Sequence, residues 1–217
     1  MNAMYQATIL NTEPMFKSVG HALSVAFAME TTKPSVESTT EAVIKDLRER
    51  RYGIDPIEHA ETSVNASGLR PNEFRAQCAL IIGCVDATLP THERDAIYAR
   101  FGHQMRRAFG VRNLRDHYCS LCNTQSVGAV HALIMGIYVR HVTQEPGESP
   151  QAFNKRRKRR ELEWSLRSIE REYGVGKNVL NRDQKMLRGI FYGLEVQAQE
   201  KLEVVFLHDG LIVDPNT

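Results

Sequence analysis

The stretch Ser165–Leu187, SLRSIEREYGVGKNVLNRDQKML, decides the fold because it holds two helical patterns separated by a glycine. The first pattern is apolar at helical spacing, through Leu166, Ile169 and Tyr173. Gly174 follows, and glycine adopts a positive φ without a Cβ clash. Val175 comes next and is placed to fill the angle between two helices. The stretch therefore predicts a short helix, a tight turn and a second helix.

The second pattern separates residues that anchor a helix from residues that it exposes. Its apolar anchors are Val179, Leu180 and Leu187. The polar residues expected on the exposed side are Gly176, Lys177, Asn178, Asn181, Arg182 and Lys185. Asparagine and arginine side chains pair bidentately with adenine and guanine edges. We therefore expect Asn178, Asn181 and Arg182, with Lys177 and Lys185 beside them, to face double-stranded DNA.

Six consecutive cations precede this stretch, namely Lys155, Arg156, Arg157, Lys158, Arg159 and Arg160. Residues 155–185 hold eleven cations and five anions, a local excess of six, although the whole chain has a net charge of only +2. Phosphate contacts by Lys and Arg dominate nucleic-acid affinity. An isolated basic run is typically a solvated arm. Beside two such helices, it predicts an arm that holds DNA phosphates.

Helical spacing of apolar residues continues through the rest of the chain. It predicts helices within 15–28, 72–87, 91–101 and 127–141, and no alternating strand pattern persists. Residues 143–152, TQEPGESPQA, are polar and contain two prolines, which is typical of a linker. We predict an all-α protein with an N-terminal helical bundle (1–142), a basic linker (143–160) and a C-terminal unit (161–217).

The residues of that C-terminal unit resemble the helix-turn-helix of bacterial and phage transcription regulators, in which Ser-Ile, Gly-Val and a later Val or Leu form the core. The stretch 89–102, LPTHERDAIYARFG, is similar to the first helix of sigma-factor-type DNA-binding units. Together they resemble small regulators of phages and prophages, including the late-gene antiterminators of lambda-like phages. The resemblance implies promoter-proximal DNA binding and contact with host RNA polymerase. Many helix-turn-helix proteins also bind DNA as dimers.

Two residues depart from the helix-turn-helix pattern. Glu170 or Arg171 stands near a position where a small alanine lets the helices approach, which predicts a looser crossing. Gly176 stands where Ser or Thr often caps the second helix, and glycine has no side chain to accept a backbone hydrogen bond.

The C-terminal segment predicts one more amphipathic helix. Its apolar face carries Leu194, Ala198, Leu202, Val205 and Phe206, and Gly210 is placed to end it. The charges between residues 195 and 214 are mostly acidic, so this helix is not a DNA surface. It packs on the core, pairs with a second copy or meets another protein, and core packing is the interpretation we favour.

Four cysteines are too few for a disulfide scaffold in 217 residues. His117, Cys119 and Cys122 form a Cys-x-x-Cys pair with a nearby histidine, to which His103 or His131 adds a fourth zinc ligand. A single pair is more typical of free thiols, and a redox pair is a third alternative. We therefore expect no cofactor, and we keep zinc as the alternative.

The sequence lacks the motifs of membrane proteins, secreted proteins and the common enzyme classes. No window is apolar enough to span a bilayer, and the N-terminus lacks a signal-peptide pattern, so we expect a cytoplasmic protein. Walker, nucleophile-elbow, zincin and dinucleotide-binding motifs are absent, so we do not expect an enzyme. Two alternatives remain open. One is a helical module that binds a host protein without sequence-specific DNA recognition, and the other is an enzyme that acts on nucleic acid.

Overall fold

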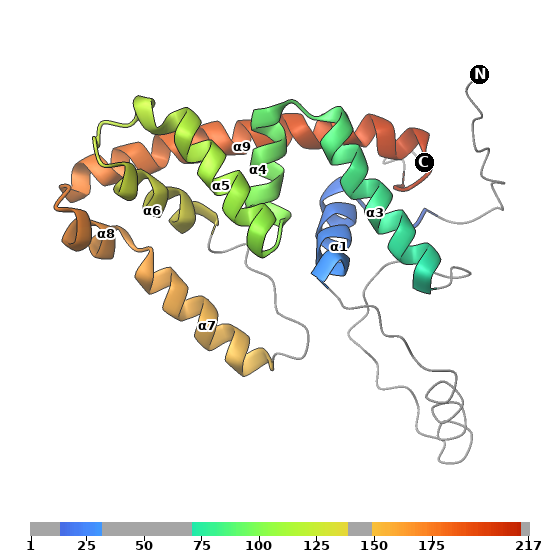
Figure 1. Cartoon of the computed structure of the whole chain (residues 1–217), viewed down its shortest axis with the longest axis horizontal. Coiled ribbons are helices and arrows are strands. Elements are labelled where there is room, and N and C mark those ends of the chain that lie inside the picture. The colour runs from blue at the N-terminus through green and yellow to red at the C-terminus, as the bar shows by residue number, and fades with distance from the viewer. Residues whose placement is uncertain (1–13, 32–70, 139–148, 214–217) are drawn as a thin grey trace, which may run out of the picture.

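The computed structural model describes residues 14–31, 71–138 and 149–213, and this part of the chain is helical without a strand (Figure 1). The all-α prediction is therefore confirmed. The helices are α1 (Val19–Thr31), α3 (Pro71–Thr88), α4 (Thr91–Phe101), α5 (Gln104–Tyr118), the 3-10 helix η1 (Cys119–Leu121), α6 (Val127–Tyr138), α7 (Pro150–Glu163), α8 (Leu166–Tyr173) and α9 (Lys177–His208).

Helix α9 runs along the length of the molecule and contributes to two hydrophobic cores (Figure 1). Its 32 residues bury one face, which carries Leu180, Leu187, Phe191, Ala198, Leu202 and Phe206. The first half of this face packs with α5, α6 and α8. The second half packs with α1, α3 and α4. One continuous helix thus holds the two halves of the protein together.

The chain ends of the described part meet beside the second half of α9. Phe16 is buried, and its backbone N–H donates to the carbonyl of Leu211 over 2.9 Å. The N–H of Val213 donates back to the carbonyl of Phe16 over 3.3 Å. Gly210 adopts a φ of +66° just after α9, as expected for a glycine that ends a helix. The chain therefore turns back at Gly210 and covers the start of α1.

Two ion pairs join α4 to the second half of α9. Arg100 pairs with the buried Glu195, and Lys201 pairs with the buried Glu93 over 2.5 Å. Burial raises the pKa of Glu195, although Arg100 and Tyr138 oppose that shift. Each helix contributes one cation and one anion, so each buried carboxylate has a partner of opposite charge. These pairs set the position of α9 along α4.

The predicted division at residue 161 does not separate two cores. Helix α9 belongs to both cores, so the described residues of the C-terminal unit pack together with α1, α3, α4, α5 and α6. The expected linker also differs: its residues 150–160 lie in α7, with Ser149 capping the helix by accepting from the N–H of Ala152. Residues 143–148 lie outside the described ranges. The basic run is therefore presented on a helix.

Gly110 lets α4 and α5 approach each other closely. A Cβ atom at this position would lie 2.5 Å from the carbonyl oxygen of Asp95 and 2.9 Å from the backbone nitrogen of Ala99. Both are backbone atoms, so they cannot rotate away as a side chain does. Only glycine fits this crossing without a shift of α4 relative to α5.

We predict that Gly110→Ala lowers the free energy of unfolding by about 1–3 kcal/mol, because the added methyl group overpacks the α4–α5 contact. The control is Gly83→Ala in α3, where a Cβ atom meets nothing within 4 Å. There the substitution should stabilise the helix by about 0.5–1 kcal/mol. Urea unfolding followed by circular dichroism measures both changes. Equal effects at the two sites would contradict the close approach.

Candidate nucleic-acid interface

Helix α8, the following turn and the start of α9 adopt the local geometry that the sequence predicts. Ser165 caps α8 by accepting from the N–H of Ser168 over 3.3 Å. Gly174 has a φ of +65°, which is the left-handed conformation that glycine adopts without strain. The N–H of Gly174 donates to the carbonyl of Glu170 and closes the turn over 2.9 Å. The turn thus depends on the glycine, as expected.

Glu170, which stands near the crossing of the two helices, also caps the N-terminus of α9. Gly176 provides no side-chain cap for α9. The carboxylate of Glu170 instead accepts from the N–H of Lys177 over 3.1 Å. A carboxylate at a helix N-terminus also interacts favourably with the helix dipole. The two departures from the motif therefore compensate each other, because the larger residue at one supplies the cap missing at the other.

The inner side of this unit is buried at Leu180 and Leu187 as predicted, whereas the third expected anchor, Val179, is only partly buried and lies outside both cores. Ile169, Leu180 and Leu187 are buried in one core, and Val175 packs against its edge. Tyr173 covers the start of α6, where Gly128 leaves space for its ring. The orientation of α8 and of the start of α9 is thus set by the core behind them.

Asp183 fixes the rotation of α9 and was not predicted to have a role. Its buried carboxylate accepts from the backbone N–H and side-chain amide of Asn123 over 3.0 and 2.8 Å, and from the N–H of Thr124 over 2.9 Å. Burial alone raises the pKa of Asp183, but these hydrogen bonds outweigh burial and the net pKa is lowered. The ionised carboxylate therefore ties α9 to the segment before α6.

All five residues that we expect to face DNA from α9 are exposed: Lys177, Asn178, Asn181, Arg182 and Lys185. They lie on the side opposite the anchors, because a helix that buries Leu180, Asp183 and Leu187 must turn these positions outward. A buried Asn178 or Arg182 is incompatible with base contact, and neither is buried. The side chains are free to meet a ligand.

The basic run lies along α7, which has no buried residue and projects away from both cores (Figure 1). Lys155, Lys158, Arg159 and Arg160 are exposed. Arg156 and Arg157 are partly covered because their guanidinium groups lie over the ring of Phe153, 5.6 and 5.9 Å from its centroid. Arg157 also pairs with Glu161 over 3.7 Å. The helix therefore presents cations on several sides.

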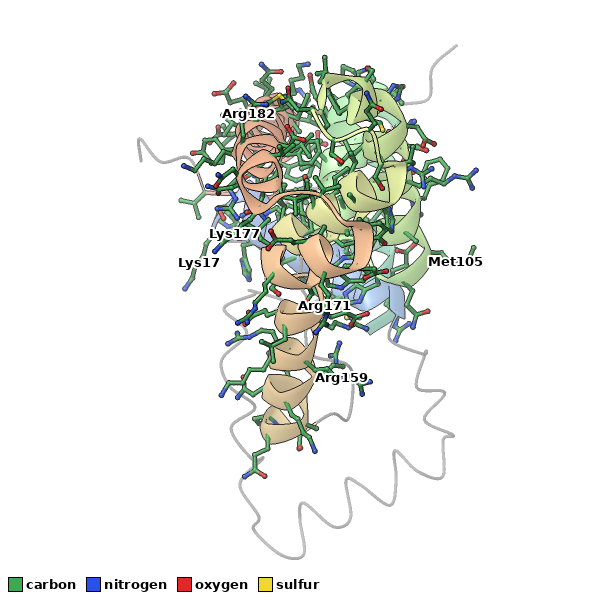
Figure 2. The ribbon with its side chains drawn as sticks, turned by 90° about the vertical axis from the view of Figure 1, so that its left-hand side faces the viewer. Lys17, Met105, Arg159, Arg171, Lys177 and Arg182 are labelled. Atoms are coloured by element: carbon green, nitrogen blue, oxygen red, sulfur yellow. The ribbon has the colours of Figure 1, made fainter. Side chains whose placement is uncertain are left out.

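Helix α8 adds two exposed cations that the sequence motif does not single out, Arg167 and Arg171. Figure 2 shows Arg159, Arg171, Lys177 and Arg182 at the end of the molecule where α7, α8 and the start of α9 meet. Beneath them, burial and the nearby Arg160 lower the pKa of Arg107 to about 10. We call the exposed cations of these three helices the basic face: Lys155, Lys158, Arg159, Arg160, Arg167, Arg171, Lys177, Arg182 and Lys185.

The described residues give the zinc alternative no supporting geometry. Cys119 and Cys122 are free thiols, and burial raises the pKa of Cys122 to about 11, with Asp183 and Cys119 adding to that shift. His117 is exposed and stacks edge-on against His92, with ring centroids 4.0 Å apart. Within the described ranges, no three His, Cys, Asp or Glu side chains gather to hold a metal ion.

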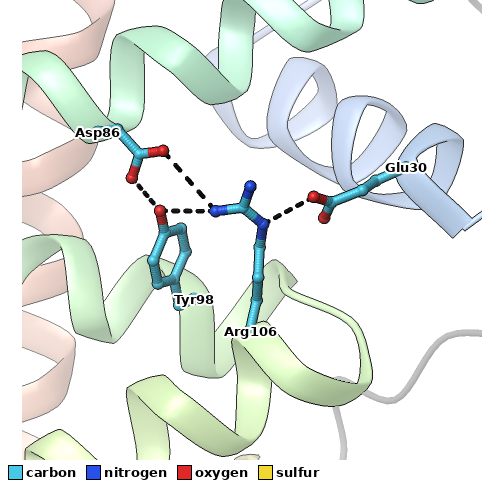
Figure 3. Close-up of polar contacts among 4 residues, drawn as sticks. All are labelled: Glu30, Asp86, Tyr98 and Arg106. Atoms are coloured by element: carbon cyan, nitrogen blue, oxygen red, sulfur yellow. Dashed lines mark hydrogen bonds and ion pairs between the residues drawn. The ribbon is translucent and has the colours of Figure 1, made fainter.

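A second surface feature lies where α1, α3, α4 and α5 meet (Figure 3). The guanidinium of Arg106 pairs with Glu30 over 2.7 Å and donates to the hydroxyl of Tyr98 over 2.8 Å. The hydroxyl of Tyr98 in turn donates to the carboxylate of Asp86, which also lies close to the Arg106 guanidinium. Burial, followed by the bond to Asp86, raises the pKa of Tyr98 to about 12. An open cavity of about 400 Å³ lies beside this cluster, lined by Asp86, Arg94, Tyr98, Met105, Arg106 and Phe109.

Comparison of the sequence with models of known protein families and with curated proteins gave no match. Within the described part of the chain, no helix is both long and apolar enough to cross a membrane.

We predict that Asp183→Asn lowers the free energy of unfolding by about 2–3 kcal/mol, because a neutral amide accepts poorly from three donors that remain partly buried. Asp116→Asn is the matched control, since Asp116 is exposed on α5, and its effect should stay within about 0.5 kcal/mol. Urea unfolding at neutral pH gives both values. A small effect of Asp183→Asn would show that the hydrogen bonds to Asn123 and Thr124 do not hold α9.

The same variant should have a pH-dependent effect. Because the folded-state pKa of Asp183 is lowered, its stabilisation is complete above the unfolded-state value of about 3.9 and is lost as the pH falls through the folded-state value. The stability difference between wild type and Asp183→Asn should thus be constant above about pH 5 and shrink below about pH 4. Urea titrations at successive pH values test this sign, and a difference that grows in acid would contradict it.

Proposed function

We propose that the chain is a cytoplasmic, sequence-specific double-stranded DNA-binding transcription regulator of phage or prophage origin. The observation that carries this proposal is the basic face, the nine exposed cations of α7, α8 and the start of α9, of which Arg159, Arg171, Lys177 and Arg182 are seen together on the side of the molecule shown in Figure 2. Cations grouped in this way release counterions when they contact phosphates, which favours binding to nucleic acid. Contact with RNA polymerase or another host protein belongs to the same proposal, whereas a homodimer is a separate proposal that DNA binding does not require.

The arrangement of α8 and α9 supports a helix-turn-helix role within this function. In such units the second helix enters the major groove and its first residues contact base edges. Here the first turns of α9 expose Asn178, Asn181 and Arg182, whose side chains match adenine and guanine edges. Asp183 holds these turns against the core from the other side. The rigid support favours base reading over a merely electrostatic contact.

Helix α7 has a different role in the proposal. It carries six consecutive cations and has no buried residue, so it is not needed to complete a core. Phosphate contacts position a protein on DNA without reading its sequence. We assign α7 to the phosphates next to the site that α9 reads.

A second candidate function is a helical module that binds a host protein, and the cavity beside α5 favours it. Met105 is 85% exposed and Phe109 is 52% exposed at its edge. Exposed apolar side chains beside a cavity are typical of protein contacts. Purification from a lysate with nuclease distinguishes the two: loss of all partners after digestion supports the nucleic-acid role, and persistence of one polypeptide supports the module.

We predict that replacing all six residues Lys155–Arg160 by Gln weakens binding to every DNA sequence alike, because these side chains contact phosphates. The slope of log affinity against log salt should flatten by up to about five. Glutamine keeps a helix propensity close to that of Lys and Arg, so α7 should persist. Mobility-shift titrations at several salt concentrations measure the slope. A wild-type protein without any salt-dependent DNA binding would refute the proposed function.

We further predict that Arg182→Ala relaxes sequence preference. Sites selected by the wild type from a random duplex library should bind the variant about 10–100-fold more weakly, since a bidentate base contact contributes about 1–3 kcal/mol. Affinity for unselected DNA should change little. Arg188→Ala is the control, because Arg188 is exposed on the same helix but lies beyond the residues assigned to bases. Equal losses for the two variants would argue against base reading by Arg182.

A further inference from the structure

The outer face of α9 carries charges that DNA binding explains only in part. We define this face by residues that follow each other at helical spacing on the side away from the cores and that are exposed or partly exposed: Arg182, Lys185, Gly189, Tyr192, Val196, Glu200 and Glu203. Its first part is basic and its last part is acidic. DNA accounts for the cations but is repelled by the two glutamates.

Helix stability does not account for this pattern either. Arg182 and Lys185 carry like charges three residues apart, and Glu200 and Glu203 do the same. Pairs of like charge at this spacing destabilise a helix slightly. No residue of opposite charge lies four positions from any of the four on α9. No salt bridge joins them to another described residue, whereas Lys201 on the same helix is paired with Glu93. The four charges are thus available to another molecule.

The centre of the outer face is suited to close helix packing. Tyr192 is 65% exposed, and an aromatic ring of this kind commonly forms the centre of an interface. Val196 adds a partly exposed apolar side chain one turn further along. Gly189 and Gly193 flank the ring, and a Cβ atom at either position would meet nothing within 4 Å. A second helix can therefore approach the backbone of α9 at this point and pack against the ring.

The spacing of the charges makes this face complementary to itself. Arg182 and Lys185 lie ten and seven residues before Tyr192, and Glu200 and Glu203 lie eight and eleven residues after it. When two copies of α9 pack antiparallel about Tyr192, the cations of each copy therefore lie opposite the glutamates of the other. Cations therefore face glutamates at both ends of the contact, as the symmetry of a two-fold interface requires.

We propose that α9 mediates an antiparallel, two-fold symmetric homodimer centred on Tyr192. Arg182 and Lys185 of each copy pair with Glu200 and Glu203 of the other, while the glycines admit the close approach. The dimer covers Arg182 and Lys185, and so it excludes DNA from the start of α9. This last consequence rests on the proposed function, whereas the dimer itself does not.

The test is a charge-reversal exchange read by sedimentation equilibrium of the full chain at low salt. Wild type should show a concentration-dependent rise from the monomer mass of 24.6 kDa to twice that value. The variants R182E/K185E and E200K/E203K should each remain monomeric, because each opposes like charges across the interface. Their equimolar mixture should recover the dimer, and so should the chain that carries all four reversals. The control R112E, on the exposed side of α5, should dimerise like wild type.

Tyr192→Ala supplies an independent readout and should weaken association at least tenfold, since truncating a central aromatic anchor removes about 2 kcal/mol or more. A wild type that stays monomeric, or an equimolar mixture that fails to recover the dimer, would overturn the proposal and leave the DNA-binding function standing. A second part of the experiment adds a short DNA duplex to the dimer. Release of monomers onto a duplex selected by the wild type is expected. An intact dimer that prefers the selected duplex over unselected DNA would refute the exclusion of DNA from the start of α9.

Discussion

Helix α9 must bury one face along its whole length, and most of the structure depends on this constraint. The buried face completes one core with α5, α6 and α8 and another with α1, α3 and α4. Because both cores share a single helix, the positions of the basic face and of the remaining bundle are linked. The opposite side of α9 is left to solvent along most of the helix, and the charges of its outer face lie there.

Buried acids define how α9 sits on these cores. Asp183 accepts hydrogen bonds from Asn123 and Thr124, and Glu195 pairs with Arg100 further along the helix. A buried carboxylate is costly unless it is satisfied, so each acid favours only one rotation of the helix. Hydrophobic packing supplies the stabilisation, while the acids select the register. The exposed side of α9 thereby gains a fixed set of residues, which base recognition and self-association both require.

Helix boundaries and turns were predictable from the sequence where a single residue type determines the backbone conformation. Helix α4 occupies the predicted range Thr91–Phe101, and Gly174 takes the predicted positive φ. Helix α5 was not predicted, because in its first half Met105 and Phe109 face solvent while Arg107 is covered, and only Val111 and Leu114 in its second half bury apolar side chains. The second helix of the turn and the separate C-terminal amphipathic helix that the sequence predicts are one continuous helix, α9, with Gly189 inside it. The partners of Asp183 and Glu195 lie 60 and 95 residues away, beyond any local pattern.

The basic face brings together residues that sequence reasoning grouped separately, the run on α7 and the polar side of α9, and adds Arg167 and Arg171 between them. The most direct test of the account is amide hydrogen exchange of the full chain with and without duplex DNA selected from a random library. Exchange should slow in α7, α8 and the first turns of α9, with no change around Met105 and Phe109. Protection confined to Met105 and Phe109, or no protection at all, would contradict it.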